Sequence, residues 1–425
     1  MRRASLLIAL VVVPLLAGGQ PARPPLSIAV GGLCQDYLEA CGCGGRNAGG
    51  LARRAAILTQ WRAETAGAKV LLEAGDLGQR VDRLPVIARC LARLGVDVVA
   101  LTGADLAAWS TLSPALADHS LAVTSLAAPA GVTVPSWRVV EAGGGWKVGV
   151  IAVPGGLLAG PDLRDAVAKA VKQLRGPEGC QVVVLFSDLG ADDTSALQQR
   201  LAADERPTVV ALDTDADFPT APSEKDGVIW LGVARRGRSV SVVDVPVQGL
   251  PQARAMLVED GPHDPVIEVW VDEYYRHVRD GETTASPTAA EVVYPRPAAC
   301  VECHGRAVNA WRRHPHSQAV ATLEQRGRDV AGCLRCHDET FRRAGVRPAA
   351  SGDRGVQCAT CHQGLEAHLK SPRTARPTAL DKAGCETCHT AENSPHWDYE
   401  RYRTNVLGAC RGNPQPRLTH DGGGR

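Results

Sequence analysis

Four copies of one short motif, Cys-x-x-Cys-His, lie between residues 300 and 389. They span Cys300–His304, Cys333–His337, Cys358–His362 and Cys385–His389. Two thiols at this spacing can add across the two vinyl groups of one porphyrin, and the adjacent histidine can then bind the iron. The spacing therefore predicts covalent attachment of one c-type haem at each copy.

This prediction gives the motif residues two roles. The thiols that attach haem are Cys300, Cys303, Cys333, Cys336, Cys358, Cys361, Cys385 and Cys388. The imidazoles that bind iron from the proximal side are His304, His337, His362 and His389. The expected cofactors are four covalently bound c-type haems with their iron. Zinc is the alternative, because paired cysteines also bind zinc, but zinc gives no reason for a histidine after every pair.

An electron-transferring haem needs a second axial ligand, and histidine is the remaining candidate. The two methionines, Met1 and Met256, lie outside the haem region. The histidines outside the motifs after residue 295 are His314, His316, His368, His396 and His420. His277, on a helix expected at 266–279, could bind a haem or lie on the surface.

The segments Trp311–Ala319 and Gly364–His368 resemble those that supply distal histidines in multihaem cytochromes of the cytochrome c-554 type. The resemblance covers roughly residues 297–403. It implies that His316 and His368 are distal ligands, with His314 as the alternative to His316. Two such ligands for four haems leave at least one iron open, unless His277, His314, His396 or His420 fills the gap.

The N-terminus has the pattern of a secretory signal. Arg2 and Arg3 precede the apolar stretch Leu6–Leu16, and small residues follow at 17–19. We therefore predict a signal peptide over residues 1–19, with an uncleaved anchor as the alternative. Attachment of c-type haem outside the cytoplasm agrees with export to the periplasm.

Length and charge limit the remaining possibilities. A chain of 425 residues favours two domains. The net charge of +1 gives no sign of nucleic-acid binding, and no membrane span is expected beyond the signal peptide. The expected partners are periplasmic redox proteins, and the sequence leaves the oligomeric state open.

Residues 26–247 alternate apolar runs with amphipathic stretches, which predicts an α/β domain. The expected strands are Leu26–Val30, Lys69–Glu73, Val96–Leu101, Ser120–Thr124, Lys147–Val153, Gln181–Phe186, Pro207–Leu212, Gly227–Val233 and Ser239–Val245. The expected helices are Gly50–Thr65, Arg83–Leu94, Asp162–Leu174 and Thr194–Ala203.

The segments Gly49–Leu58, Val70–Asp76 and Leu94–Leu101 resemble metallophosphoesterases of the 5′-nucleotidase type. The resemblance implies a sandwich of mixed sheets and helices. That family binds two metal ions through several histidines, but here Asp76 alone matches cleanly. Thr102–Asp105 and Asp188 lie at positions where that family has metal-binding segments that contain histidine. The domain is therefore expected to be catalytically degenerate.

Aspartates follow several of these strands, namely Asp76, Asp105, Asp188, Asp213, Asp215 and Asp217. They could hold a hard metal ion, or they could serve in turns and helix caps. Without histidine partners we favour the second role. His119, the one histidine within 26–247, lies outside these segments.

Cys34, Cys41 and Cys43 lie in a glycine-rich loop. This loop could form a disulfide or a redox or soft-metal site. Cys90 and Cys180 lie in apolar segments and are expected to be buried.

Two segments connect the domains. Gln248–Asp264 is rich in Gly and Pro and is predicted to be a connection. Val266–Arg279 is predicted to be a helix, and Gly281–Thr288 a linker after it. Residues 248–294 thus precede a haem domain at 295–425. That domain is expected to be mainly α with little regular structure, because aliphatic runs are scarce there and porphyrins must supply apolar surface.

These features predict an exported tetrahaem cytochrome that transfers electrons between periplasmic redox partners. One alternative is a multihaem oxidoreductase that acts on a small nitrogen or sulfur compound at an open haem. Another is a metallophosphoesterase with an accessory cytochrome domain, which the missing histidines disfavour.

Overall fold

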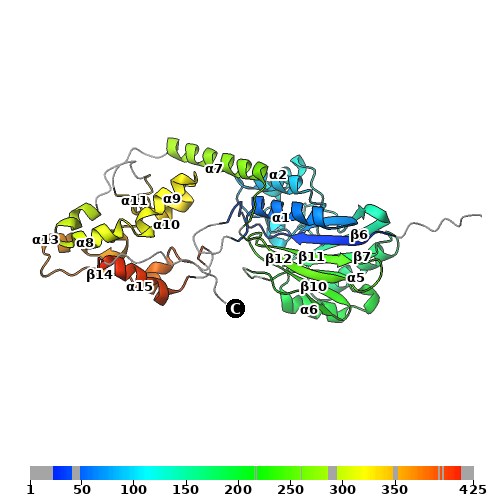
Figure 1. Ribbon diagram of the computed structural model, residues 1–425. Helices are drawn as coiled ribbons and strands as arrows, with labels where there is room; N and C mark the ends of the chain where they lie inside the picture. Colours follow the sequence, from blue (N-terminus) through cyan, green and yellow to red (C-terminus); the bar gives the residue numbers. More distant parts are fainter. Residues whose placement is uncertain are drawn as a thin grey trace, which may run out of the picture.

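The computed structural model describes residues 23–40, 48–214, 216, 218–259, 261–285, 294–347, 353–390, 393–394 and 397–412. The chain forms an N-terminal and a C-terminal domain, and the helix α7 (Pro265–Ala285) runs between them (Figure 1). No helix in this part of the chain is long and apolar enough to cross a membrane. The predicted signal peptide, residues 1–19, lies outside the described residues.

The N-terminal domain contains two six-stranded sheets of mixed direction. One sheet has the order β12 (Gln252–Leu257), β11 (Ser239–Val245), β1 (Leu26–Gly31), β2 (Ala68–Glu73), β3 (Val98–Ala100) and β4 (Val123–Thr124). The other has the order β5 (Arg138–Ala142), β6 (Trp146–Val153), β7 (Val182–Ser187), β8 (Val209–Asp213), β10 (Val228–Val233) and β9 (Ser223–Lys225).

The two sheets pack face to face through an apolar layer that includes Val30, Val70, Val148 and Val184. Helices cover the outer faces, which explains why the central strands are apolar on both sides. The first sheet is covered by α1 (Leu51–Glu64), α2 (Leu84–Leu94), α4 (Trp109–Asp118) and α7, and the second by α5 (Gly160–Arg175) and α6 (Ala191–Arg200). Shorter helices are α3 (Gly103–Ala107) and the 3₁₀ turns Gly143–Gly145 and Ala203–Glu205. The predicted α/β sandwich is confirmed.

Three strands, β5, β9 and β12, were not predicted. β12 lies inside the segment Gln248–Asp264, which we interpreted as a connection, and it pairs with β11 along the edge of the first sheet. Its residues are half-buried or exposed and include Gln252 and Arg254, so it lacks the apolar pattern of a central strand. The N-terminal sheet therefore extends beyond residue 247.

The helix predicted at Val266–Arg279 is longer in the structure. α7 continues through Ala285, so the predicted linker at Gly281–Thr288 is helical over its first part, and its remaining residues are not described. One reason is that Glu282 accepts a hydrogen bond from the Ala331 amide and pairs with Arg347 at 2.8 Å.

The C-terminal domain consists of short helices around irregular chain, as predicted. They are α8 (Val301–Trp311), α9 (Ala319–Gln325), α10 (Ala331–His337), α11 (Glu339–Ala344), α12 (Cys358–Cys361), α13 (Leu365–Lys370), α14 (Lys382–Glu386) and α15 (Tyr399–Cys410). A small hairpin joins β13 (His362–Gln363) and β14 (Thr378–Ala379), and 3₁₀ turns lie at Pro297–Cys300 and Pro315–Gln318.

Arg328 connects the two domains. Its guanidinium donates to Glu39 at 2.5 and 2.9 Å and to Asp272 of α7 at 2.6 Å. It also lies 4.4 Å from the ring centroid of Tyr275. Because the Arg328 side chain is only 11% exposed, these contacts are poorly screened by solvent, and they fix how the C-terminal domain sits on α7.

Candidate functional site

A cavity of about 1660 Å³ lies within the C-terminal domain and extends to the loops that follow β1 and β2. All eight motif cysteines and all four motif histidines line it. Its volume exceeds the roughly 300–1,000 Å³ of a typical small-molecule pocket. The cavity occupies the place of a conventional core, so the chain alone does not fill the centre of this domain.

Helical turns orient the motif residues toward this cavity. Cys333 and Cys336 lie within α10, and Cys358 and Cys361 form the two ends of α12. The two thiols of a motif lie three positions apart and therefore on one face of such a turn. This geometry suits attachment of one planar group by each motif.

Two pairs of histidine rings face each other in the cavity. The ring centroids of His304 and His368 are 6.1 Å apart, and those of His316 and His389 are 5.9 Å apart. With a metal–imidazole bond of about 2 Å on each side, two imidazoles on opposite faces of one iron have centroids roughly 6 Å apart. Both distances therefore fit a shared iron, and each pair joins a motif histidine to a predicted distal histidine.

Three histidine rings that line the cavity have a fixed orientation because their Nδ1 atom is hydrogen-bonded. The Nδ1 of His337 lies 3.0 Å from the Ala319 carbonyl oxygen, and that of His368 lies 2.8 Å from the Ala375 carbonyl oxygen. A carbonyl can only accept, so Nδ1 carries the proton and the Nε2 lone pair is available to bind a metal. The Nδ1 of His389 lies 3.1 Å from the Ser394 hydroxyl.

His316 is half-buried, and its buried Nδ1 has no hydrogen-bond partner among the described residues. Burial lowers its pKa to about 3, and His314, His389 and His337 add to the effect. The ring is therefore neutral and able to bind a metal. An orphaned buried nitrogen in this cavity fits a group that the polypeptide itself does not supply.

The backbone just before the third motif positions His316. The Val356 amide donates to the His316 carbonyl oxygen at 3.0 Å. Gly355 has a φ of 95°, and a Cβ at this position would lie 2.7 Å from the Ser317 carbonyl oxygen. Glycine is therefore required for this close approach.

His314 is a poorer candidate than His316. Its Nδ1 accepts the His316 amide at 3.3 Å, which leaves the proton of the neutral ring on Nε2. Its ring stacks on Trp311 with centroids 4.8 Å apart. His277 lies exposed on α7, away from the residues that line the cavity. His396 and His420 lie outside the described residues.

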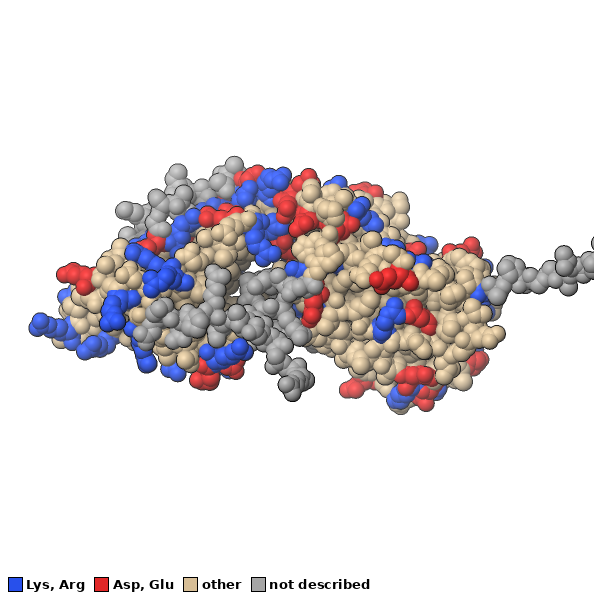
Figure 2. Space-filling model, viewed as in Figure 1, with Lys and Arg blue, Asp and Glu red and all other residues tan. Residues whose placement is uncertain are grey.

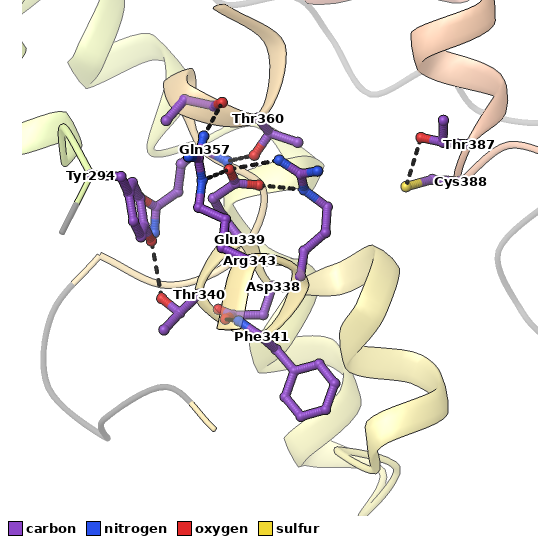
Figure 3. Close-up of polar contacts among 12 residues, drawn as sticks. Tyr294, Asp338, Glu339, Thr340, Phe341, Arg343, Gln357, Thr360, Thr387 and Cys388 are labelled. Atoms are coloured by element: carbon purple, nitrogen blue, oxygen red, sulfur yellow. Dashed lines mark hydrogen bonds and ion pairs between the residues drawn. The ribbon is translucent and has the colours of Figure 1, made fainter. Parts of the chain in front are cut away.

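A buried hydrogen-bond network connects the second and third motifs (Figure 3). Glu339, whose side chain is fully buried, accepts from Arg343 at 2.5 Å and also binds Arg342. Arg343 in turn donates to the Ala359 carbonyl oxygen of α12 at 3.0 Å. Asp338, which directly follows His337, accepts the Gly355 amide at 3.1 Å. The network fixes α12 relative to α10.

Aspartates gather at the ends of strands in the N-terminal domain. Burial raises the pKa of Asp76 to about 6, opposed by a hydrogen bond from Gln35 and assisted by Asp105, Asp213 and Asp188. No three or more His, Cys, Asp or Glu side chains in the described part of the chain are arranged to hold a metal ion. Asp215 and Asp217 are not among the described residues.

Two of these carboxylates bind backbone amides. Asp105 accepts the amides of Asp76 at 2.7 Å, Leu77 at 2.9 Å and Thr102 at 2.9 Å. Asp188 accepts those of Gly103 at 2.8 Å and Gly155 at 3.1 Å. Their oxygens therefore hold loops together, which agrees with the predicted role in turns and caps.

Cys34 is a buried thiol. Its Sγ lies 3.4 Å from Glu73 Oε1, and Glu73 pairs with the buried Arg54 at 3.1 Å. Burial raises the pKa of the Cys34 thiol far above its ordinary value, so the thiol is protonated. Cys90 and Cys180 are buried, as predicted. Cys41 and Cys43 lie outside the described residues, and both interpretations of this loop remain predictions.

Comparison with known families identifies the cavity-bearing part of the chain. Residues 299–363 match the family described as cytochrome c554 and c-prime. This match covers the first three motifs and His316. Together with the lining of the cavity, this match supports a C-terminal cytochrome c domain with covalently bound c-type haem.

Solved structures show the fold of the N-terminal domain. A 5′-nucleotidase precursor from Thermus thermophilus aligns with 21% identity and a TM-score of 0.50, over 60% of this chain and 59% of its own. The sulfate thiohydrolase SoxB from the same species, in complex with glycerol, aligns with 14% identity and a TM-score of 0.50, over 60% and 61%. The chain thus spans about three-fifths of each. No curated protein sequence matches it.

Sequence reasoning missed the residues that orient these histidines. Ala319 and Ala375 act through their carbonyl oxygens, which carry no signal in the sequence. Ser394 follows His389 closely and has a hydroxyl, but nothing in the sequence marks it as a partner. The ring of Trp397 stacks on His389 with centroids 5.0 Å apart, and the sequence alone does not indicate this role.

We predict that the N-terminal domain does not hydrolyse nucleotides or simple phosphate esters with manganese or zinc. The histidine ligands of the phosphoesterase family are absent, and Asp105 and Asp188 are occupied by backbone amides. Release of inorganic phosphate should equal the rate in buffer with the metal alone. Metal-dependent turnover that Asp76→Ala abolishes would show that a working metal site exists.

Proposed function

We propose that this protein is an exported tetrahaem c-type cytochrome that transfers electrons between periplasmic redox partners. The observation that carries the proposal is the pair of facing histidine couples inside a cavity lined by all four motifs. Bound haem supplies one-electron redox chemistry, tuned by its axial ligands and its burial. The N-terminal domain serves as a scaffold or docking unit.

Each histidine couple belongs to one haem in this proposal. His304 and His368 hold the haem of the first motif, and His389 and His316 hold that of the fourth. The two residues reach each haem from opposite faces, so exogenous ligands are excluded at both sites. His337, and by analogy His362, hold the other two haems from the proximal side.

The second and fourth attachment sites adjoin each other, as do the first and third. The thiols of Cys336 and Cys388 are hydrogen-bonding neighbours, and so are those of Cys300 and Cys358. These contacts support two closely spaced pairs of haems. Electrons can pass between cofactors in such an array without movement of the chain.

An oxidoreductase that acts on a small nitrogen or sulfur compound is the second candidate. It is supported by His362, which faces no second imidazole in the way that His304 and His389 do within the described part of the chain. A haem with one axial histidine can bind a small ligand at its free position.

The periplasmic location rests on the N-terminal pattern and on haem attachment outside the cytoplasm.

Haem stoichiometry tests the proposed function. We expect mass spectrometry of the denatured protein to show four covalent haems after removal of residues 1–19. The double variant Cys385→Ser/Cys388→Ser should carry three, because each motif attaches one haem. An unchanged number of attached haems in the variant, or zinc retained without haem, would contradict the tetrahaem assignment.

A further inference from the structure

A cationic surface lies at the end of the C-terminal domain that carries α13. We call it the α13 patch, and it consists of Lys370, Arg373 and Arg376 around Leu369. The three cations are exposed, and the Leu369 side chain is 46% exposed. Figure 2 shows Lys and Arg side chains gathered at this end of the molecule.

The cations of the α13 patch are free of acidic partners within the described part of the chain. Several other arginines of this domain form ion pairs: Arg328 with Glu39, Arg342 and Arg343 with Glu339, Arg347 with Glu282, and Arg354 with Glu324. Glu366, one turn before Lys370 on α13, forms no ion pair with it. The patch therefore presents uncompensated positive charge.

The α13 patch is connected to an axial histidine. His368 lies next to Leu369, and its Nδ1 donates to the Ala375 carbonyl oxygen at 2.8 Å, between Arg373 and Arg376. Leu369 and Arg376 also line the haem cavity. A protein bound on this patch would therefore lie directly beside the haem held by His304 and His368.

We propose that the α13 patch is the docking surface for an acidic one-electron redox protein. The proposal rests on the proposed electron-transfer function and names the partner's chemistry. One electron leaves the reduced cofactor of the partner, and the ferric haem iron at His304 and His368 becomes ferrous. No covalent bond or proton is exchanged.

The composition of the α13 patch suits this role. An apolar centre with a charged rim is the usual anatomy of a transient interface. Complementary charge accelerates association by about 10- to 1,000-fold at low salt. The Debye length falls from about 30 Å at 0.01 M to about 8 Å at 0.15 M ionic strength, so salt should weaken the effect.

The experiment compares three charge-altered holoproteins with the wild type. The patch variant is Lys370→Glu/Arg373→Glu, and Lys370→Gln/Arg373→Gln provides a milder form. The matched control, Lys169→Glu/Arg200→Glu, makes the same charge change as the patch variant at exposed positions of the N-terminal domain. The probes are an acidic plant-type ferredoxin, with a potential of about −400 mV, and reduced riboflavin as a neutral reductant.

Stopped-flow reduction and calorimetric binding are measured at low and high ionic strength. We expect the patch variant to lose at least about tenfold in second-order rate with ferredoxin at low salt, with a parallel loss of binding. The control should stay within about twofold, and the difference should vanish at high salt. Reduction by riboflavin should be the same in all of these proteins.

Two outcomes would overturn the α13 patch as a docking surface. Equal losses in the patch and control variants would show that only overall charge matters. A patch variant that riboflavin also reduces more slowly, with a shifted midpoint potential, would show that the cations act on the haem propionates instead. If riboflavin reduces none of the proteins, the electron-transfer function itself fails.

Discussion

Replacement of His368 by alanine is expected to make one additional haem high-spin and able to bind CO when reduced. The affected haem should be the one attached at Cys300 and Cys303, because His304 and His368 face each other at a distance that fits one iron. Loss of one imidazole leaves a five-coordinate iron with a free position. His316→Ala should act in the same way on the haem of the fourth motif.

Reduced-minus-oxidised and CO-difference spectra of the purified holoproteins provide the measurement. The wild type should show a minority of high-spin haem, and each variant should add about one haem equivalent of CO binding, since each removes one axial ligand. The double variant should add about two, because the two couples belong to different motifs. His277→Ala is the matched control, since His277 lies exposed on α7, and it should leave the spectrum unchanged.

Either variant with an unchanged spin state would show that the corresponding histidine is not a ligand. A wild type that is wholly low-spin and inert to CO would remove the physical basis of the oxidoreductase alternative. His314, His396 or His420 would then have to complete the remaining coordination.

The α/β sandwich could be predicted well from the sequence because its central strands are buried on both faces and read as apolar runs. Edge strands have no such pattern, which is why β5, β9 and β12 were missed. The C-terminal end of α7 is stabilised by an ion pair between Glu282 and Arg347. Arg347 lies far along the chain, so the local sequence does not reveal this contact. The four Cys-x-x-Cys-His motifs could be recognised in the sequence because covalent attachment of haem fixes their spacing.

The choice between His314 and His316 illustrates where sequence reasoning stops. Both rings lie two residues apart in the same segment, and only the resemblance to multihaem cytochromes favoured His316. The structure adds a physical reason, because the His314 Nδ1 already accepts a backbone amide, whereas the buried His316 Nδ1 has no partner among the described residues. The pairing of each distal histidine with a particular motif depends on tertiary contacts.

Protein produced without haem is expected to keep a folded N-terminal domain and to lose the structure of the C-terminal domain. The cavity of about 1660 Å³ is the reason. Without haem, the apolar side chains that line this space lose their packing partners. Aliphatic runs are scarce in this part of the chain, so no conventional core replaces those contacts.

Limited proteolysis and thermal unfolding of the haem-free chain provide the measurement, with the holoprotein as control. Cleavage should remove the residues after α7 and leave the N-terminal domain with the first part of α7 intact, because Ile267, Val271, Tyr274 and Tyr275 anchor α7 in the N-terminal core. The end of α7 should fray, since its contact with Arg347 is lost. A haem-free protein that resists protease over residues 294–412 would mean that the polypeptide fills this space by itself, and the cavity would then not be a binding site created by the cofactors.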